Sequence, residues 1–223
     1  MTETSPRSPQ AFCLAAVDLG SNSFHLNITR VDHDQICPIH TLSERVQLGE
    51  ENDSGALTPA AVGRGLACLK RFKQLLDETG PYPIRVVGTH ALRRAKNRSD
   101  FITPAEALLG TPIEILHGEE EARLIYTGVA QTLSDSQTPH LVIDVGGGST
   151  EFILGCDAKP LRLESLPLGC VSYGEAFFQA ETSRRLGSTP RANKQAMRSQ
   201  RSIQASAMPS GKRQLARREH SSP

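Results

Sequence analysis

Short apolar runs alternate with longer amphipathic stretches between residues 12 and 166, and this pattern predicts strands alternating with helices. The β-rich runs Phe12–Asp18 and Phe24–Val31 are joined by the polar turn Gly20-Ser21-Asn22, which predicts a hairpin. A third strand is expected within Ile36–Leu48. The chain is therefore expected to open with three consecutive strands.

The first long helix is predicted to run from Thr58 to Glu78. Thr58 suits the N-cap position and Pro59 suits the first helical position. Large apolar side chains then recur every three or four residues and define one buried face: Val62, Leu66, Leu69, Phe72 and Leu76. Gly80-Pro81 is expected to end the helix.

Further elements follow in alternation. Helices are predicted at residues 91–96, 104–109, 119–133 and 172–178, and strands at residues 84–87, 113–116, 141–145, 151–154 and 161–166. The order is one β-β-β-α-β-α-β-α run followed by the start of a second one. An α/β protein is therefore expected.

The turn after the first strand recurs 126 residues later. Val17–Ser23 aligns with Ile143–Ser149 so that Asp, Gly and Ser coincide, and apolar residues match on both sides. A single such segment has the composition of an ordinary tight hairpin turn. Two copies, each opening a run of strands, predict duplicated domains that face each other.

Each copy of this loop also suits phosphate binding. Glycine permits unusual backbone conformations and lets N–H groups approach an anion closely, while serine adds a hydroxyl donor. Asp18 and Asp144, near the ends of the two strands, can hold Mg²⁺ opposite a phosphate. Two such loops across a cleft would grip a chain of phosphates from both sides.

Two charged clusters lie between the loops. Glu119-Glu120-Glu121 opens a predicted helix, where acidic residues are common because they interact favourably with the helix dipole. A carboxylate near the cleft can alternatively orient a water molecule, and Glu121 is the one next to the apolar face. The basic cluster consists of Arg93, Arg94, Lys96 and Arg98. It suits either a solvated helix face or a clamp on phosphate.

The net charge of +1 conceals an uneven distribution. Residues 1–183 carry 15 Lys and Arg against 23 Asp and Glu, whereas residues 184–223 carry 10 against 1. The basic segment has no aromatic residue and few large aliphatic ones, so we expect a disordered tail. Such a tail is either solvated or binds acidic partners, and without aromatic side chains for base stacking we expect no specific nucleic acid.

The composition of the chain indicates the cellular compartment in which the protein is expected. No stretch approaches the roughly 20 apolar residues of a membrane span, and the N-terminus lacks an apolar signal core. The five cysteines are scattered, which suits free thiols in a reducing cytosol better than disulfides or a metal site. His25, His90 and His117 also lack metal-ligand spacing. We therefore expect a cytoplasmic protein; peripheral binding at the inner membrane surface is left open.

Five motifs carry a family resemblance: AAVDLGSNSFHLNITRV, VVGTHALRRAKN, GEEEARLIYTGVA, LVIDVGGGSTEFILG and LPLGCVSYGEAFF. In order and spacing they resemble the exopolyphosphatase and guanosine pentaphosphate phosphohydrolase family, from about Phe12 to Phe178. The resemblance implies an actin-like ATPase (ribonuclease H-like) α/β fold of two domains with a cleft between them. It also implies Mg²⁺-dependent removal of terminal phosphate from inorganic polyphosphate or from guanosine pentaphosphate.

The resemblance also implies roles for individual residues. Glu121 matches the family's catalytic base and Arg93 a phosphate-contacting arginine. Asp144 and Glu151 match its metal and catalytic acidic residues, and Asp18 is the further metal candidate. The two phosphate loops are matched by Ser21, Asn22, Ser23, Gly146, Gly147, Gly148, Ser149 and Thr150. Gly148 favours the exopolyphosphatase branch, because the pentaphosphatase branch often carries alanine there.

Family members continue beyond the point where the similarity ends, so we expect a truncated chain. Residues 11–133 are expected to form domain one, residues 134–183 part of domain two, and residues 184–223 the tail. Three readings of function remain open besides the exopolyphosphatase: a guanosine pentaphosphate hydrolase, an inactive fragment that binds polyphosphate, and a relative of actin-like sugar or acetate kinases. A homodimer is also left open.

Overall fold

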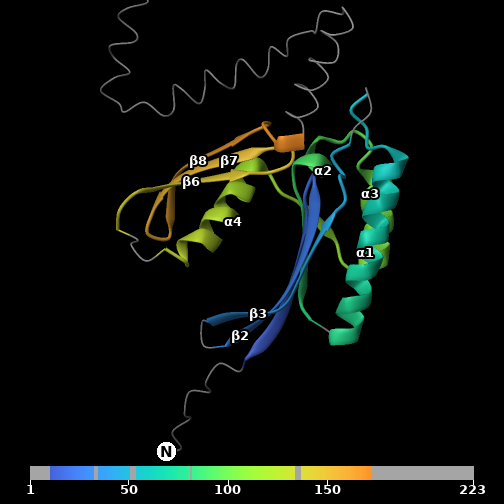
Figure 1. The fold of residues 1–223 in the computed structure, drawn as a ribbon, viewed down its shortest axis with the longest axis horizontal. Helices are drawn as coiled ribbons and strands as arrows, with labels where there is room; N and C mark the ends of the chain where they lie inside the picture. The colour runs from blue at the N-terminus through green and yellow to red at the C-terminus, as the bar shows by residue number, and fades with distance from the viewer. Residues whose placement is uncertain (1–10, 33–34, 51–53, 81, 134–136, 172–223) are drawn as a thin grey trace, which may run out of the picture. The chain divides into compact units, whose positions relative to one another are not determined.

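The computed structural model describes residues 11–32, 35–50, 54–80, 82–133 and 137–171. These residues belong to one compact unit, which contains a five-stranded and a three-stranded sheet (Figure 1). The predicted helix at 172–178 and the predicted tail from residue 184 lie outside the described residues. The domain boundaries therefore stay predictions. Among the described helices, none has the length and apolar character that a membrane crossing requires.

The first sheet combines an antiparallel and a parallel half. Its strands are β1 (Phe12–Leu19), β2 (Ser23–Asp32), β3 (Gln35–Arg45), β4 (Ile84–Gly88) and β5 (Ile113–Ile115). They lie in the order β3-β2-β1-β4-β5, with β1, β2 and β3 antiparallel and with β4 parallel to both β1 and β5. The predicted hairpin and the third strand are thus confirmed.

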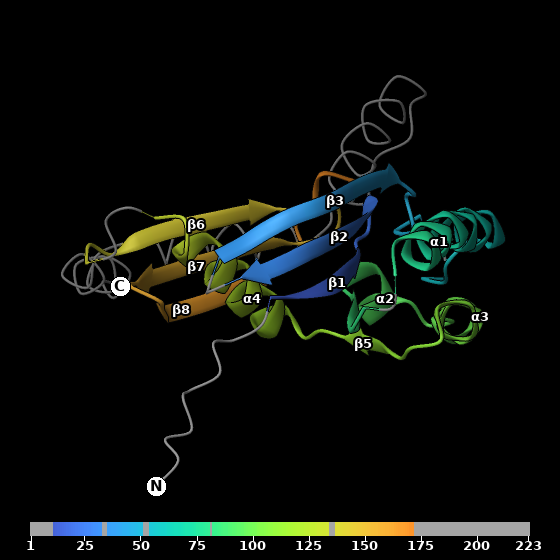
Figure 2. The same ribbon diagram turned by 90° about the horizontal axis from the view of Figure 1, so that it is seen from below.

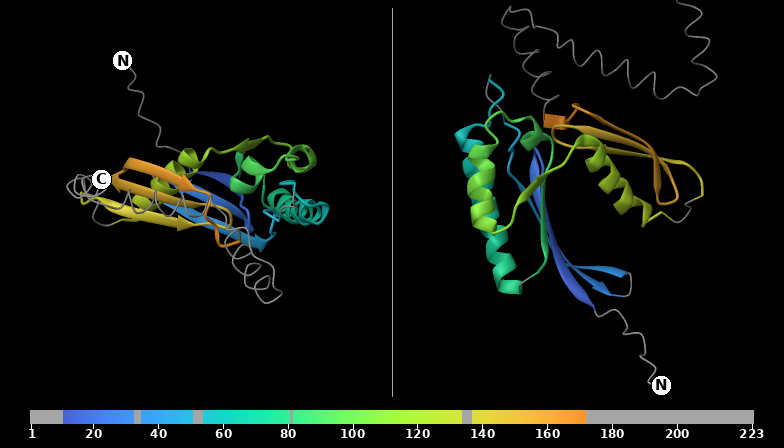
Figure 3. Two further views of the ribbon diagram at one scale, coloured as in Figure 1. Left: turned by 90° about the horizontal axis from the view of Figure 1, so that it is seen from above. Right: turned by 180° about the vertical axis from the view of Figure 1, so that it is seen from behind.

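The helices of this part of the chain are α1 (Pro59–Thr79), α2 (His90–Arg94), α3 (Ser99–Leu109) and α4 (Gly118–Ala130). The predicted start of α1 is confirmed, since Thr58 Oγ1 accepts a hydrogen bond of 3.1 Å from Ala61 N. α1 and α3 lie side by side along one face of the first sheet (Figures 1 and 3).

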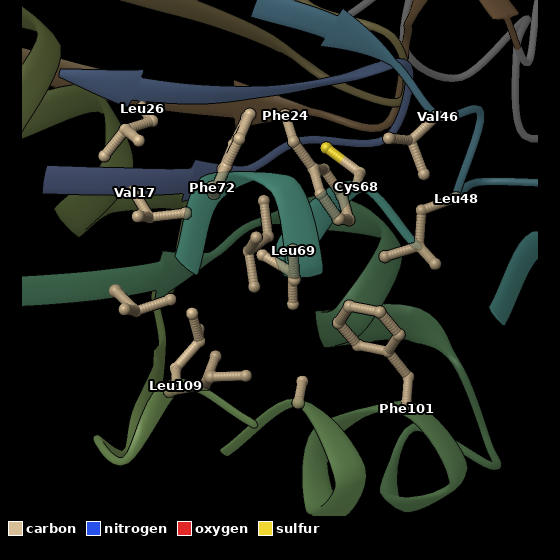
Figure 4. Packing of buried hydrophobic residues seen from close by; sticks show 14 of the residues in the cluster. Val17, Phe24, Leu26, Val46, Leu48, Cys68, Leu69, Phe72, Phe101 and Leu109 are labelled. Carbon is tan, nitrogen blue, oxygen red and sulfur yellow. The ribbon is translucent and has the colours of Figure 1, made fainter. Parts of the chain in front are cut away.

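The main core lies between the first sheet and these two helices (Figure 4). Phe24 from β2, Phe72 from α1 and Phe101 from α3 are fully buried in it. The rings of Phe24 and Phe101 meet edge to face, with centroids 5.9 Å apart. Strand β1, which ends at the first loop, is therefore held on a rigid support.

Three helix boundaries differ from the sequence-based prediction. α3 begins at Ser99, five residues before Pro104, which lies inside the helix. Phe101 anchors this first turn in the core, and its burial compensates for the hydrogen bond that Pro104 cannot donate. α2 ends at Arg94 because Ala95 is extended, and α4 ends at Ala130 instead of residue 133.

The second sheet is an antiparallel meander of β6 (His140–Val145), β7 (Thr150–Cys156) and β8 (Lys159–Leu166). Helix α4 packs on one face of it, where Ala122, Tyr126 and Ile153 are fully buried (Figures 1 and 2). The Tyr126 hydroxyl donates a 2.9 Å hydrogen bond to Asp157 O. Several large apolar side chains of the sheet are exposed instead: Leu141, Ile143, Val145, Leu154 and Leu161.

Candidate phosphate-binding site

The two predicted loops are closed by equivalent backbone hydrogen bonds. Gly20 N donates a 3.1 Å hydrogen bond to Ser23 O, and Gly146 N donates a 2.9 Å bond to Ser149 O. Both donors and both acceptors are 126 residues apart, the offset found in the sequence repeat. Each loop thus connects two antiparallel strands of its own sheet in the same way.

The two loops lie against each other. A methyl group added at Gly147 would lie 2.9 Å from the backbone nitrogen of Asn22. One added at Gly148 would lie 2.7 Å from Ser21 Oγ and 2.5 Å from His90 Cδ2. The loop glycines do not have positive φ angles, which among the described glycines occur at other positions. Glycine is needed here for close approach, and the expected unusual backbone conformation is not the reason.

Three polar atoms of the first loop lack a protein partner. Asp18 Oδ1, Ser21 Oγ and Asn22 Oδ1 are buried and form no hydrogen bond within the described part of the protein. Buried polar atoms are nearly always satisfied, so unsatisfied ones at one place indicate room for a ligand or water. The first loop therefore has the free polar atoms that a bound group would contact.

The second loop is more tightly held. Ser149 and Thr150 are 3% and 6% exposed. The Thr150 hydroxyl donates to Leu168 O, so its oxygen alone is left for other contacts. Cys170 N donates to Gly146 O, and Val171 N donates to Gly147 O. These two hydrogen bonds hold the backbone of the loop in place.

Glu121 and Arg93 form an ion pair beside the loops. Arg93 Nη1 lies 3.0 Å from Glu121 Oε2 and 2.7 Å from Leu116 O, and the two side chains are 22% and 13% exposed. Burial, together with the nearby Glu151 carboxylate, raises the pKa of Glu121 to about 7, although Arg93 opposes the shift. Glu121 is thus a carboxylate that can take up a proton near neutral pH.

The other predicted acidic residues converge on the same place. Glu151 is 1% exposed, and burial raises its pKa although Ser165 Oγ donates to Glu151 Oε1 over 2.8 Å. Asp144 is directly opposite Glu151 in the β6–β7 pairing. Burial also raises the pKa of Asp18, and Asp144 adds to that rise. The structure therefore brings together all four predicted carboxylates.

The four carboxylates can bind Mg²⁺ only if a substrate phosphate and water supply further ligands. In the described part of the chain, no group of three His, Cys, Asp or Glu side chains is arranged to hold a metal ion. Mg²⁺ commonly binds to one or two carboxylates and completes its shell with water and substrate phosphates. The unpartnered Asp18 Oδ1 and the nearby Asp144 suit that mode of binding.

A pocket of about 540 Å³ adjoins Arg93. It lies beside α2, the start of α4 and the strand β8, and its lining residues are His90, Arg93, Arg94, Gly118, Glu119, Arg162, Leu163, Glu164, Ser165 and Pro167. A methyl group at Gly118 would lie 2.6 Å from Ser165 Oγ, so glycine lets α4 approach β8 closely here.

Sequence reasoning missed Ser165 and Arg162 as site residues. Both lie on β8, and only the β7–β8 register, which pairs Ser165 with Glu151, places this strand at the site. His90, which lacks metal-ligand spacing in the sequence, lies against Gly148 of the second loop. Its position directly after β4 and the turn Gly88-Thr89 was the available signal.

Two facing glycine-serine loops, four carboxylates and an arginine together form a candidate site for phosphate groups. The comparisons with known proteins agree. A model of the Ppx/GppA phosphatase family matches residues 27–200. The chain belongs to this family.

Solved structures of the family have the same fold. The Ppx/GppA enzyme of Aquifex aeolicus is 32% identical with a TM-score of 0.66, over 75% of this chain and 56% of that one. An exopolyphosphatase from Cytophaga hutchinsonii is 32% identical with a TM-score of 0.67, over 72% and 51%. The predicted α/β fold is thereby confirmed as the fold of this family, and the chain spans about half the length of these structures.

Proposed function

We propose that this protein is an exopolyphosphatase, which releases the terminal phosphate of inorganic polyphosphate. The observation that carries the proposal is the partly buried Glu121 carboxylate, whose pKa is raised to about 7, beside Arg93 and two facing phosphate loops. A base with a pKa near the working pH is the most effective at accepting a proton. The exopolyphosphatase among the similar structures supports the substrate class.

The loops and Arg93 would position the terminal phosphate. Ser21 and Asn22 present polar atoms that lack partners in the described part of the chain, and Gly147 and Gly148 lie close to these two residues. Arg93 uses Nη1 for Glu121 and Leu116 and has other guanidinium N–H groups that can bind phosphate oxygens. Holding the phosphorus and the water in fixed geometry lowers the entropic part of the barrier.

Glu121 would orient the attacking water. The water oxygen forms a bond to the terminal phosphorus while the bridging P–O bond breaks, and the water proton passes to Glu121. The products are inorganic phosphate and a polyphosphate chain one unit shorter. Arg93 stabilises the charge on the transferred phosphoryl oxygens.

Mg²⁺, held by Asp144 with Asp18 or Glu151, would supply neutralisation of the phosphate charge when bound. Ser165 keeps Glu151 in place through its 2.8 Å hydrogen bond. Because Asp18 Oδ1 is buried without a partner among the described residues, a cation there would also relieve an unfavourable polar burial.

The experiment compares phosphate release from long-chain polyphosphate with Mg²⁺ by the unmodified protein, Glu121→Gln and Glu120→Gln. Glu120 is the neighbouring carboxylate, half exposed and paired with Arg123, so its variant is a matched control. We expect phosphate release by the unmodified protein and by Glu120→Gln. In Glu121→Gln the rate should fall about 100-fold or more, because general base catalysis typically contributes a factor of about 10²–10⁴.

Two results would contradict the proposal. Full release by Glu121→Gln would exclude Glu121 as the base. Thermal stabilisation of the folded protein by polyphosphate without any phosphate release would reduce the function to binding. Faster turnover of guanosine pentaphosphate than of polyphosphate would favour the other activity of this family.

A further inference from the structure

The pocket beside Arg93 contains arginines for which the proposed reaction has no use. Arg93 pairs with Glu121, but Arg94 at the end of α2 and Arg162 on β8 are placed elsewhere on the pocket wall. The two residues are 68 positions apart in sequence, and the fold brings them to one pocket.

We propose that Arg94 and Arg162 form a second phosphate subsite, which binds the phosphate groups that follow the terminal one in an inorganic polyphosphate chain. The inference rests on the proposed function for the identity of the terminal site. Binding of the chain can be measured without turnover, so the two can fail separately.

The pocket is continuous with the reaction site. Arg93 lines it and also bonds Glu121, and Ser165 lines it and also bonds Glu151. A phosphate chain that ends beside Glu121 can therefore continue along these two residues towards Arg94 and Arg162. The volume of about 540 Å³ lies within the roughly 300–1,000 Å³ of small-molecule sites and leaves room for more than one phosphate group.

The pocket lining contains guanidinium groups that can bind an anion. Besides Arg93, which is paired with Glu121, it includes Arg94 and Arg162 together with two carboxylates, Glu119 and Glu164. His90 adds no charge at neutral pH, because burial and the adjacent Arg93 and Arg94 lower its pKa to about 4. Arg94, Arg162 and Glu164 already take part in other interactions, to which contacts with a bound phosphate would be added.

The lining also favours an inorganic chain over a nucleotide. No Phe, Tyr or Trp is among the described lining residues, and the His90 ring is only 9% exposed. A nucleobase would thus find no aromatic face on which to stack, whereas guanidinium groups bind phosphate oxygens in a bidentate manner. The subsite therefore suits a phosphate chain that carries no base.

The test measures binding of long-chain polyphosphate and of inorganic phosphate without Mg²⁺ by calorimetry, using Arg94→Gln, Arg162→Gln and the double variant. Arg94 and Arg162 are both exposed, so we expect the variants to fold, and unfolding curves check this. Arg85→Gln is the control: it removes the same charge from an exposed residue on β4 that pairs with Glu114. Glu164→Gln is a second variant that removes a negative charge from the pocket.

We expect the double variant to bind the long chain about tenfold or more weakly, since each lost charged hydrogen bond alone weakens binding by roughly that factor or more. Binding of inorganic phosphate, which has no group beyond the terminal one, should change by less than about twofold, and Glu164→Gln should strengthen long-chain binding. With turnover, KM for the long chain should rise while kcat is unchanged.

Three results would overturn the inference: unchanged long-chain binding in the double variant, equal losses for both ligands, or an equal loss in Arg85→Gln. A protein that binds the long chain through these arginines but releases no phosphate would contradict the proposed function and leave the subsite intact.

Discussion

Glu121 shows how burial prepares one side chain for chemistry. The carboxylate is 13% exposed, and Glu151 lies near enough to disfavour a second negative charge. Arg93 offsets part of this effect but not all of it. The ionised form of the Glu121 carboxylate is therefore disfavoured, while the ion pair with Arg93 holds the side chain in place.

The rate of phosphate release should follow the ionisation of Glu121. Because the carboxylate form is the base and its pKa is about 7, the rate should rise about tenfold per pH unit below 7 and level off above it. At pH 5 the rate should be about a hundredfold below the plateau. A pH profile of kcat/KM measures this, and a profile that is flat from about pH 5 to 8 would exclude Glu121 as the titrating base.

The same pKa implies that Glu121 lowers stability at high pH. A carboxyl whose pKa is raised on folding binds protons more readily in the folded state, so the free energy of unfolding falls as pH rises from about 4.5 through 7. Glu121→Gln, which can still accept from Arg93, should therefore raise the free energy of unfolding at about pH 8 by about 1–2 kcal/mol. Urea unfolding at about pH 5 and pH 8 tests this, and a gain as large at the lower pH would rule out the ionisation as its cause.

The two faces of the second sheet differ in burial, as one isoleucine on each face shows. Ile153 on β7 is fully buried against α4, whereas Ile143 on β6 is 51% exposed. Ile153→Ala should lower the free energy of unfolding by about 2–5 kcal/mol, because it leaves a cavity under Tyr126. Ile143→Ala should cost about 1 kcal/mol or less. Equal losses in denaturant unfolding would mean that Ile143 is buried in solution.

How far the sequence predicts each element depends on how local its signals are. The start of α1 is readable because Thr58, Pro59 and the apolar spacing act within one helix. The start of α3 is not, since Phe101 holds that turn by a contact with Phe24, which is distant in sequence. The facing loops were predicted because the repeat itself is in the sequence, but the roles of Ser165 and Arg162 depend on strand pairing.

At the scale of the whole described unit, the site joins two sheets. The first loop belongs to one sheet and the second loop to the other, and their contacts run through Ser21, Asn22 and the glycines at 147 and 148. A ligand held by both loops must therefore stabilise both sheets together.

Polyphosphate at about 100 times its dissociation constant should add about 2.7 kcal/mol to the free energy of unfolding, or about 5–10 °C in Tm. In hydrogen exchange, the amides of both loops should gain protection at the same ligand concentration. Calorimetry and exchange mass spectrometry measure these effects. Protection confined to the first loop would show that the second does not take part in binding.

The space at Gly148 makes one position in the sequence informative about the width of the site. A single methyl group there would meet both His90 and Ser21 at distances of 2.5 and 2.7 Å. A related chain with alanine at this position must hold its two loops further apart or turn the histidine away. The residue at position 148 therefore limits how closely the two loops of this fold can approach each other.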